Sequence, residues 1–414
     1  MVIRKVSALI LAAVLCLSLT ACGGDTGGGG GGGGGKVIEF WSIFTGGDGM
    51  AMDAIVNAYN ATNPEYTVKH VMVDQTDLYT RMPLLTSSQE GVPDLVINHV
   101  DRIESSAKAD MYLPLDSYIA ANGKIKGENY VPAAWDPGEV DGVRYGIPLD
   151  LHSYVCYYNK DLVEKYCPNV LDDGVVTFDE VASFADTAAA DGVYTYAITW
   201  ARCEILSWYY QLGGKLTENG TDPTLNNPTF QRVFEDFADA YAKKWTTQDG
   251  DQPNNLFTQG KLIFLPEGTW MRQTVESMGV NYGETYMIAY DAKNPLQWAS
   301  SHQFVMPKNN NMTDEKAAAI MDFINFVGEN SYEWANYGQI PAAKAVLSDS
   351  RINDLPQKFL IENAHVMVIS DYLYFGAVLE ALDAVAYEIP FGRLSAADGI
   401  AQMQQQVETT IKNQ

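Results

Sequence analysis

The stretch VIEFW (Val37–Trp41) sets the fold expected for this chain. It reads as a short apolar strand, and it runs into a loop rich in glycine and threonine at Ser42–Gly49. The following residues, Met50–Tyr59, carry apolar side chains at helical spacing and stop before Asn63-Pro64. The next three segments repeat the alternation of extended and helical patterns: Tyr66–Val73, Leu78–Ser88 and Pro93–Ile97. Strand, helix, strand, helix, strand predicts an α/β unit with a largely parallel sheet.

Ligands of such sheets bind beyond the C-terminal ends of the strands. In this sequence those ends are Trp41–Gly47 and Asn98–Arg102. Farther along we expect a hairpin-like turn, a strand, a second α/β segment and two amphipathic helices, in this order: Asp141–Tyr145, Tyr154–Tyr158, Thr177–Tyr290, Asp314–Phe326 and Asp398–Ile411. The predicted fold class is therefore α/β, and a chain of 414 residues is expected to form two domains.

The N-terminus has the pattern of an export signal. Arg4 and Lys5 precede an apolar run, Val6–Leu17, and small residues follow. The run is too short to span a bilayer core of about 30 Å comfortably. The tetrapeptide Leu19-Thr20-Ala21-Cys22 resembles the bacterial lipobox, which implies a signal peptide over residues 1–21 and a diacylglycerol on the thiol of Cys22. An ordinary secretory signal with an incidental cysteine is the alternative.

Eleven of the thirteen residues Gly23–Gly35 are glycine. Glycine has no side chain to bury and loses the most conformational entropy on folding, so residues 22–35 are expected to form a flexible tether. Its root-mean-square reach is about 5–6 Å times the square root of its length, which places a folded body about 20 Å from a membrane surface. Such a tether suits capture and delivery of a solute, and it also suits surface enzymes and adhesins.

The chain is strongly acidic, with a formal net charge of −25 at pH 7. An acidic surface disfavours nucleic acid and anionic lipid as partners, and basic residues are nowhere clustered enough to follow a phosphate backbone. Hydrophobic residues make up 47% of the chain, which is ample for a large core. The composition is therefore that of a soluble globular protein whose charge keeps it in solution.

Cysteine and histidine follow no pattern typical of a disulfide framework or a metal site. Cys156, Cys167 and Cys203 form no CxxC motif and are expected to be buried and unpaired, with a bridge between Cys156 and Cys167 as the alternative. The five histidines are scattered without a metal-ligand spacing: His70, His99, His152, His302 and His365. We therefore expect no zinc, and no cofactor is predicted.

Eight short motifs occur in a fixed order along the chain: Phe40-Trp41, Pro93–Val96, Leu113–Asp116, Gly142–Pro148, Tyr157–Leu162, Thr177–Glu180, Phe257–Trp270 and Gly338–Ala342. In this order they resemble the extracellular solute-binding proteins of family 1, the maltose-binding-protein-like (cluster B) type, which deliver sugars to ABC importers. Two departures are local: Leu262–Phe264 replaces the usual Ala-Ala-Met, and Pro266 is unusual before the Gly-x-Trp turn. They bear on local packing and ligand shape, and they leave the expected fold unchanged.

The resemblance implies a two-lobe periplasmic-binding-protein-like fold (type II), with the ligand cleft between lobes joined by hinge segments. The implied lobes are residues 36–146 with 290–330, and residues 147–289 with 331–414. Gly146–Pro148 would be the first crossing between them and Met287–Tyr290 the second. A hinge motion would close the cleft, and the permease subunits would respond to the closed form. We expect a monomer that works outside the cytoplasm and is not an enzyme.

A sugar cleft needs two kinds of side chain. The C–H faces of a sugar ring pack on aromatic rings, and its hydroxyls need charged or bidentate hydrogen-bonding groups to replace the water that they lose. Such a cleft therefore shows Trp or Tyr beside Asp, Glu, Arg, Asn and His. Thirteen residues at strand ends, crossings and turns are the candidate ligand-binding set: Trp41, Thr45, Asp101, Arg102, Asp150, His152, Trp200, Arg202, Glu267, Trp270, Trp298, His302 and Tyr374.

Trp270 is the strongest of these candidates, because the resembling proteins place a stacking aromatic in the Gly-x-Trp turn. Asp101 and Arg102 follow the third expected strand, and His152 shares a strand face with Asp150. The alternative for the tryptophans is core packing. The alternative for the polar residues is a surface ion pair, a solvated loop position or packing between the lobes.

The number of aromatic candidates favours an oligosaccharide of two or more units over a monosaccharide, because each ring stacks one pyranose. Three other functions remain open, namely binding of a non-sugar solute, sugar sensing for a membrane kinase, and glycoside hydrolysis at the surface. The chain has no G-x-S-x-G, H-E-x-x-H or P-loop motif that points to an enzyme. A glycosidase, however, needs only two carboxylates about 5–10 Å apart.

Overall fold

The computed structural model describes residues 36–44 and 47–413. The expectations for the signal segment, Cys22, the glycine-rich tether and Thr45 lie outside these residues. None of the helices within the described residues is long and apolar enough to cross a membrane.

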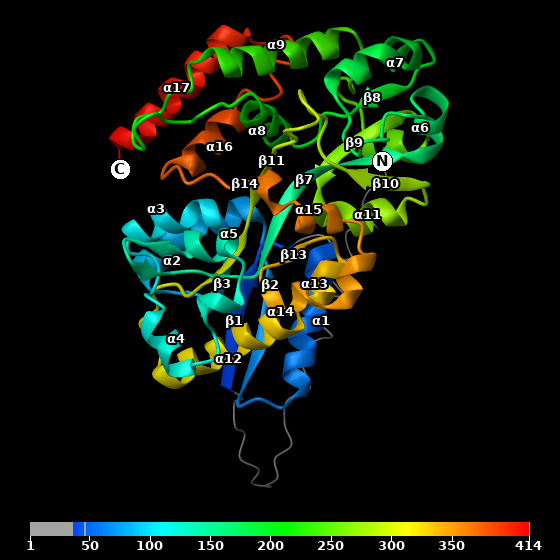
Figure 1. Ribbon diagram of the computed structural model, residues 1–414. Helices are drawn as coiled ribbons and strands as arrows, with labels where there is room; N and C mark the ends of the chain where they lie inside the picture. Colours follow the sequence, from blue (N-terminus) through cyan, green and yellow to red (C-terminus); the bar gives the residue numbers. More distant parts are fainter. Residues whose placement is uncertain (1–35, 45–46, 414) are drawn as a thin grey trace, which may run out of the picture. The chain divides into compact units, whose positions relative to one another are not determined.

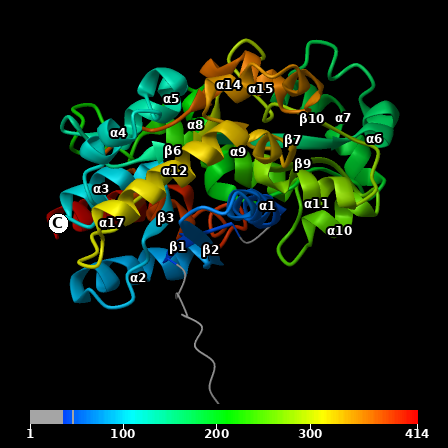
Figure 2. The same ribbon diagram turned by 90° about the horizontal axis from the view of Figure 1, so that it is seen from below.

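The first sheet has the strand order β2-β1-β3-β12-β6. Its strands are β1 (Lys36–Ser42), β2 (Tyr66–Met72), β3 (Leu95–His99), β6 (Ile147–Pro148) and β12 (His302–Val305). Strands β2, β1 and β3 are parallel, as the sequence predicts, and β12 runs antiparallel between β3 and β6. Figures 1 and 2 show helices α1 (Gly47–Ala61) and α12 (Asp314–Asn330) beside this sheet. The apolar faces of both helices are buried against it.

The second sheet has the strand order β14-β11-β7-β9-β8, and β10 and β13 also pair with β7. Its strands are β7 (Asp150–Asn159), β8 (Tyr194–Tyr196), β9 (Leu262–Gly268), β10 (Tyr282–Thr285), β11 (Gln297–Ser300), β13 (Ile340–Pro341) and β14 (Met367–Val368). Every residue of β9 is buried, which explains why its sequence is an unbroken apolar run up to Pro266. A separate hairpin joins β4 (Glu139–Val140) to β5 (Val143–Arg144), where the positive φ angles of Asp141 and Gly142 permit the tight turn.

The remaining helices surround these sheets: α2 (Gln75–Ser88), α3 (Ile103–Lys108), α4 (Asp116–Asn122), α5 (Pro132–Trp135), α6 (Lys160–Tyr166), α7 (Phe178–Ala190), α8 (Ala201–Gln211), α9 (Pro228–Ala242), α10 (Pro253–Thr258), α11 (Arg272–Ser277), α13 (Tyr332–Asn336), α14 (Lys344–Leu347), α15 (Lys358–Glu362), α16 (Phe375–Asp383) and α17 (Ala396–Lys412). Helix α17 lies along α9 and α16 on the side of the second sheet (Figure 1). Six short 3₁₀ turns connect described elements, among them η1 (Val100–Arg102) and η4 (Thr269–Met271).

Local sequence explains where α7 begins. The Oγ1 atom of Thr177 accepts a hydrogen bond from the backbone N–H of Glu180, and the Glu180 carboxylate accepts one from the backbone N–H of Thr177 (2.8 Å). This reciprocal capping box satisfies two backbone donors that the first turn of a helix leaves unpaired. The Thr177–Glu180 motif is therefore the start of helix α7.

The chain passes between the two sheets at single residues. Leu149 separates β6 of the first sheet from β7 of the second, next to the expected crossing at Gly146–Pro148. The return passage is at Ser301, because β11 pairs with β7 and β12 pairs with β3. The expected second crossing at Met287–Tyr290 is wrong: the Ala289 N–H donates to the Val176 carbonyl (2.8 Å) beside α7. Met287–Tyr290 is apolar and the passage at Ser301 lies in a polar stretch, Ser300–Gln303, so the passage is identified by strand pairing and not by the polarity of the segment.

The expected placement of residues 331–414 as a whole in the second lobe is also corrected in part. Trp334 in α13 is fully buried and its ring lies 4.6 Å from that of Phe44, which follows β1. Helix α13 accordingly packs on α1, whereas α16 and α17 pack on the core of the second sheet. The other lobe boundaries stay predictions.

Asp150, the first residue of β7, is completely buried at the first passage. Its Oδ2 atom accepts hydrogen bonds from Trp334 Nε1 (2.6 Å) and His302 Nδ1 (2.8 Å). Its Oδ1 atom accepts one from the His302 backbone N–H (3.0 Å) and lies 3.3 Å from His152 Nδ1. Burial by itself would raise the pKa of Asp150, but the two histidines and their hydrogen bonds hold it below its usual range. One ionised carboxylate thus ties β7, β12 and α13 together.

Replacement of Trp334 by Phe should lower the free energy of unfolding by about 2–4 kcal/mol, because it removes a donor from a buried carboxylate and leaves a small void. The control is Trp245→Phe, which also removes an indole–carboxylate hydrogen bond, to Asp186 (2.7 Å), but at the surface. It should cost about 1 kcal/mol or less. Denaturant unfolding of both variants checks this, and equal losses would contradict the role assigned to Asp150.

A second buried carboxyl makes stability depend on pH. Glu204 in α8 is fully buried; its Oε1 atom accepts a hydrogen bond from the Thr199 N–H (2.9 Å), and its Oε2 atom has no partner among the described residues. Burial raises the pKa of Glu204 to about 8. The unfolded chain ionises this group near pH 4.3, so the folded state holds the proton longer.

The stabilisation from protonated Glu204 should therefore be fully present below about pH 4.3 and be lost as the pH rises towards 8, at up to about 1.4 kcal/mol per pH unit. Glu204→Gln keeps an acceptor for Thr199 and removes the titration, so its stability should fall less steeply across this range. The matched control is Glu218→Gln at an exposed glutamate. Urea unfolding between pH 5 and 8 measures the slopes, and an unchanged slope in Glu204→Gln would refute the assignment.

Candidate functional site

The candidate site is a cavity of about 300 Å³ where the ends of β1 and β3 meet β7, β11 and the turn η4. Six of the thirteen sequence-predicted residues line it: His152, Trp200, Arg202, Trp270, Trp298 and His302. Its other lining residues are Ile43, Phe44, Gly47, Asp48, Asp74, Gln75, His99, Cys203, Met271 and Thr274. The strand ends of the first sheet supply Ile43, Phe44 and His99, as expected for ligands of parallel sheets.

Three tryptophans form one wall of this cavity. Trp270 in η4 makes edge-to-face contacts with Trp200 (6.3 Å between ring centroids) and Trp298 (6.4 Å). Trp200 precedes α8 and is 45% exposed, so it presents the largest free aromatic surface in the site. Trp298 in β11 is only 5% exposed, and its buried Nε1 has no partner among the described residues. The wall therefore combines an exposed ring with an unpaired donor.

Arg202 supplies the positive charge of the cavity. Its guanidinium lies 5.9 Å from the centre of the Trp200 ring and pairs with Asp383 of α16 (2.6 Å). Its buried Nε has no hydrogen-bond partner within the described part of the chain. Arg202 is thus neutralised by a carboxylate, and it retains a donor for a neutral polar group.

Three histidines from different strands meet in the same cavity. His99 ends β3, His152 lies in β7 and His302 begins β12. Their ring centroids are 4.2 Å apart for His152 and His302, 4.9 Å for His99 and His302, and 5.4 Å for His99 and His152. Burial lowers the pKa of His152 to about 4 and that of His99 well below its usual value. The scattered sequence positions therefore hid a cluster with the donor set of a metal site.

His99 is not among the thirteen sequence-predicted residues. Its signal is its place at the C-terminal end of β3, where Asn98–Arg102 is expected to contact a ligand. The Tyr79 hydroxyl of α2 hydrogen-bonds to its Nδ1 atom. Nothing in the sequence relates His99 to His152 and His302, because their proximity depends on the antiparallel pairing of β12 with β3.

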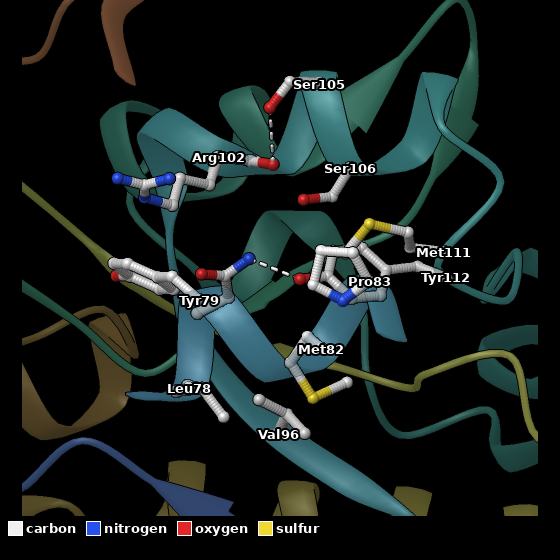
Figure 3. Close-up of a pocket in the computed structure, with 11 residues that line it drawn as sticks. Leu78, Tyr79, Met82, Pro83, Val96, Arg102, Ser105, Ser106, Met111 and Tyr112 are labelled. Carbon is white, nitrogen blue, oxygen red and sulfur yellow. Dashed lines mark hydrogen bonds between the residues drawn. The ribbon is translucent and has the colours of Figure 1, made fainter. Parts of the chain in front are cut away.

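Arg102 lines a neighbouring cavity of about 180 Å³ (Figure 3) and is not among the residues that line the tryptophan-walled cavity. Its guanidinium lies 4.0 Å from the centre of the Tyr79 ring and 3.3 Å from the Glu380 carboxylate. In the same cavity the Asn98 amide donates to the Tyr112 hydroxyl. Asp101 lies 3.5 Å from the hydroxyl of Ser300 and lines a further pocket. Asp101 and Arg102 thus lie beside the candidate site and do not line it.

Four more candidates lie away from the cavity or behind it. Trp41 is buried between Glu39, which accepts from its Nε1 (2.7 Å), and the Arg81 guanidinium. Tyr374 packs on the ring of Tyr372 (5.7 Å between centroids). Asp150 is the buried carboxylate behind the histidines. The fourth is Glu267.

Glu267, at the end of β9, is 5% exposed, and burial raises its pKa to about 7. It lines a separate cavity of about 580 Å³, to which Trp200 also contributes. Trp200 therefore borders two cavities, with Glu267 on one side and the other indoles on the opposite side.

Comparisons with known proteins show relatives over most of the chain. It is 22% identical over 352 residues to the sn-glycerol-3-phosphate-binding periplasmic protein UgpB of Rhizobium meliloti, covering 78% of each chain. It is 23% identical over 370 residues to the galactooligosaccharide-binding protein of Bacillus subtilis, covering 84% of this chain and 83% of the relative.

A solved ABC substrate-binding protein of Listeria monocytogenes, in complex with cycloalternan, superposes with a TM-score of 0.78 at 17% identity, over 91% of this chain and 99% of that one. This likeness confirms the expected two-lobe α/β fold. The family model of the bacterial extracellular solute-binding proteins matches residues 54–359, well over half of the sequence. The resemblance seen in the motifs is confirmed, and the chain belongs to the bacterial extracellular solute-binding proteins.

Proposed function

We propose that this protein is a lipid-anchored solute-binding protein that captures an oligosaccharide in the tryptophan-lined cavity and delivers it to an ABC importer permease by hinge closure. The observation that carries the proposal is the convergence of Trp200, Trp270 and Trp298 with Arg202 and the histidines in one cavity. Aromatic faces pack on sugar rings, and the polar atoms left unpaired beside them suit hydroxyl groups.

The surroundings of the cavity, more than its size, support binding of more than one sugar unit. A volume of about 300 Å³ is at the small end of the range for ligand pockets. Trp200 also borders the larger cavity that contains Glu267, so a chain of sugars could continue past its ring. The pKa of Glu267, raised by burial to about 7, leaves this carboxyl able to donate as well as accept hydrogen bonds.

The charge of the site supports a neutral ligand over an anionic one. Arg202 is the basic residue of the cavity, and Asp383 already neutralises it. The relatives include both kinds of binder, since one is named for galactooligosaccharide and another for sn-glycerol-3-phosphate. A phosphate ester would need more positive charge than the described residues supply here.

Anchoring and delivery rest on other observations. The lipobox-like Leu19–Cys22 and the glycine run support attachment through a diacylglycerol on Cys22. Membership of an extracellular solute-binding family supports a permease partner and a place outside the cytoplasm. We further propose that the protein acts as a monomer.

Sugar sensing for a membrane kinase would use the same cavity, and glycoside hydrolysis would release smaller products.

Thermal unfolding of the mature chain, measured with a panel of mono- and oligosaccharides, tests the proposed ligand class. A sugar at 100 times its dissociation constant should add about 2.7 kcal/mol of stability. We expect stabilisation by one linkage series of oligosaccharides and a smaller shift with free hexoses. Stabilisation by glycerol phosphate or an amine, with none by any sugar, would refute the carbohydrate proposal. Chromatography of the incubated sugars detects any hydrolysis.

Substitution of the most exposed indole tests the stacking role. Trp200→Ala should weaken binding of the stabilising sugar about 10- to 100-fold, because about 1.4 kcal/mol corresponds to each tenfold change. Trp200→Phe retains a ring and should recover most of the affinity. The control is Trp245→Ala, at a tryptophan that lines neither cavity bordered by Trp200. Titration calorimetry gives the three constants, and equal affinity in all variants would place the sugar elsewhere.

A further inference from the structure

The histidine cluster has the arrangement of a metal-binding site. One potential ligand atom from each of His99, His152 and His302 lies within 4.8 Å of the other two. All three residues line the cavity, so an ion can reach them from solvent. The residues come from three different strands, β3, β7 and β12, whose backbones are fixed by pairing. Sites built on strands hold their ligands more firmly than sites built on loops.

The second ring nitrogen of each histidine is already held by a partner. The Asp150 carboxylate contacts Nδ1 of His302 (2.8 Å) and Nδ1 of His152 (3.3 Å), and the Tyr79 hydroxyl contacts Nδ1 of His99. Because an ionised carboxylate only accepts hydrogen bonds, the Nδ1 atoms of His152 and His302 carry the hydrogen. Their Nε2 atoms are therefore the lone-pair nitrogens. Among the described residues, no hydrogen bond uses an Nε2 atom of the three rings.

We propose that His99, His152 and His302 bind a divalent transition-metal ion of the zinc type through their Nε2 atoms, with a further coordination position open to the cavity. Three histidines with one open position are a recurring donor set for zinc, and imidazole also suits nickel and copper. A carboxylate on the far nitrogen of the ring, as Asp150 provides for His152 and His302, is a usual outer partner of metal-binding histidine.

The ligand nitrogens of the three rings are close to the spacing that tetrahedral metal coordination requires. At metal–nitrogen distances of about 2.0–2.1 Å, tetrahedral geometry places two ligand nitrogens about 3.4 Å apart. One ligand atom of each ring lies within 4.8 Å of the other two, so an approach of up to about 1.4 Å would bring these atoms to that spacing. His152 and His302 are stacked with an interplanar angle of 29°, so the approach needs a small fan-like rotation of these rings about their Asp150 contacts. The negative charge of Asp150 favours a cation at this position, and the positive charge of Arg202, which lines the same cavity, opposes it.

Metal binding is measured directly on the mature, chelator-treated protein, without any sugar. Calorimetric titration with Zn²⁺ should show one ion per chain, and Co²⁺ should give the intense visible absorption of a four-coordinate site. No stoichiometric binding of Zn²⁺, Co²⁺ or Ni²⁺ would overturn the proposal. This outcome is independent of the proposed sugar binding, which the thermal panel measures on the metal-free protein.

Ligand substitutions identify the site. His99→Asn, His152→Asn and His302→Asn should each weaken Zn²⁺ binding at least about 100-fold, while Asn keeps a nitrogen near the former Nδ1 position for Asp150 or Tyr79. Tyr79→Phe removes only an outer partner and should cost about 10- to 100-fold. His365→Asn, at an exposed histidine, is the matched control and should leave the affinity unchanged.

Two further measurements distinguish a histidine site from a thiolate site and from a loss of folding. Cys203 also lines the cavity, so Cys203→Ser should retain the affinity; loss of binding there would replace the histidine site by a thiolate site and overturn the proposal. The thermal unfolding temperature of each Asn variant, measured without metal, shows whether the variant folds. If an Asn variant does not fold, the Zn²⁺ affinity of Tyr79→Phe is used in its place to test the site. Affinity that falls equally in His365→Asn would also contradict the assignment.

Discussion

The hydrogen bonds of Asp150 are the constraint on which the rest of this structure depends. The carboxylate is completely buried where the chain passes from the first sheet into the second. It accepts hydrogen bonds from Trp334 and His302 and contacts His152, so it joins one helix to the strands at both passages. A buried charge is tolerated only with such a set of partners, because each lost donor would leave the charge uncompensated. The position of the cavity follows from this junction.

The two sheets supply different kinds of side chain to the cavity. The second sheet and its turns supply the indoles of Trp200, Trp270 and Trp298, whereas the ends of β1 and β3 supply Phe44 and His99. Asp150 contributes no atom to the cavity surface, but it orients two of the rings that do. The carboxylate that sequence spacing assigned to the ligand thus acts through the histidines. This division explains how one junction stabilises the fold and also arranges the side chains of the site.

Sequence patterns predicted the parallel, N-terminal part of the first sheet well. Strand β1, helix α1, strand β2 and strand β3 lie where apolar periodicity and the Pro93–Ile97 run placed them. Trp270 was found from the Gly-x-Trp turn of the resembling family, and Trp200 because it follows a strand and strand ends share one edge of a sheet. Arg102 and Trp41 met the same rule and still face away from the cavity. Alternation along a strand indicates which side chains share a face, but it does not say which face borders a cavity.

The sequence by itself determined the α/β class, the order of elements and the family, because periodicity, turn residues and short motifs are local properties of the chain. Only the tertiary structure decided that the second passage is at Ser301 and not at Met287–Tyr290, since the passage is defined by the pairing of β11 with β7 and of β12 with β3, which no local pattern marks. It also brought His99, His152 and His302 together. That cluster depends on pairing between strands far apart in the chain, which leaves no spacing to recognise along the sequence.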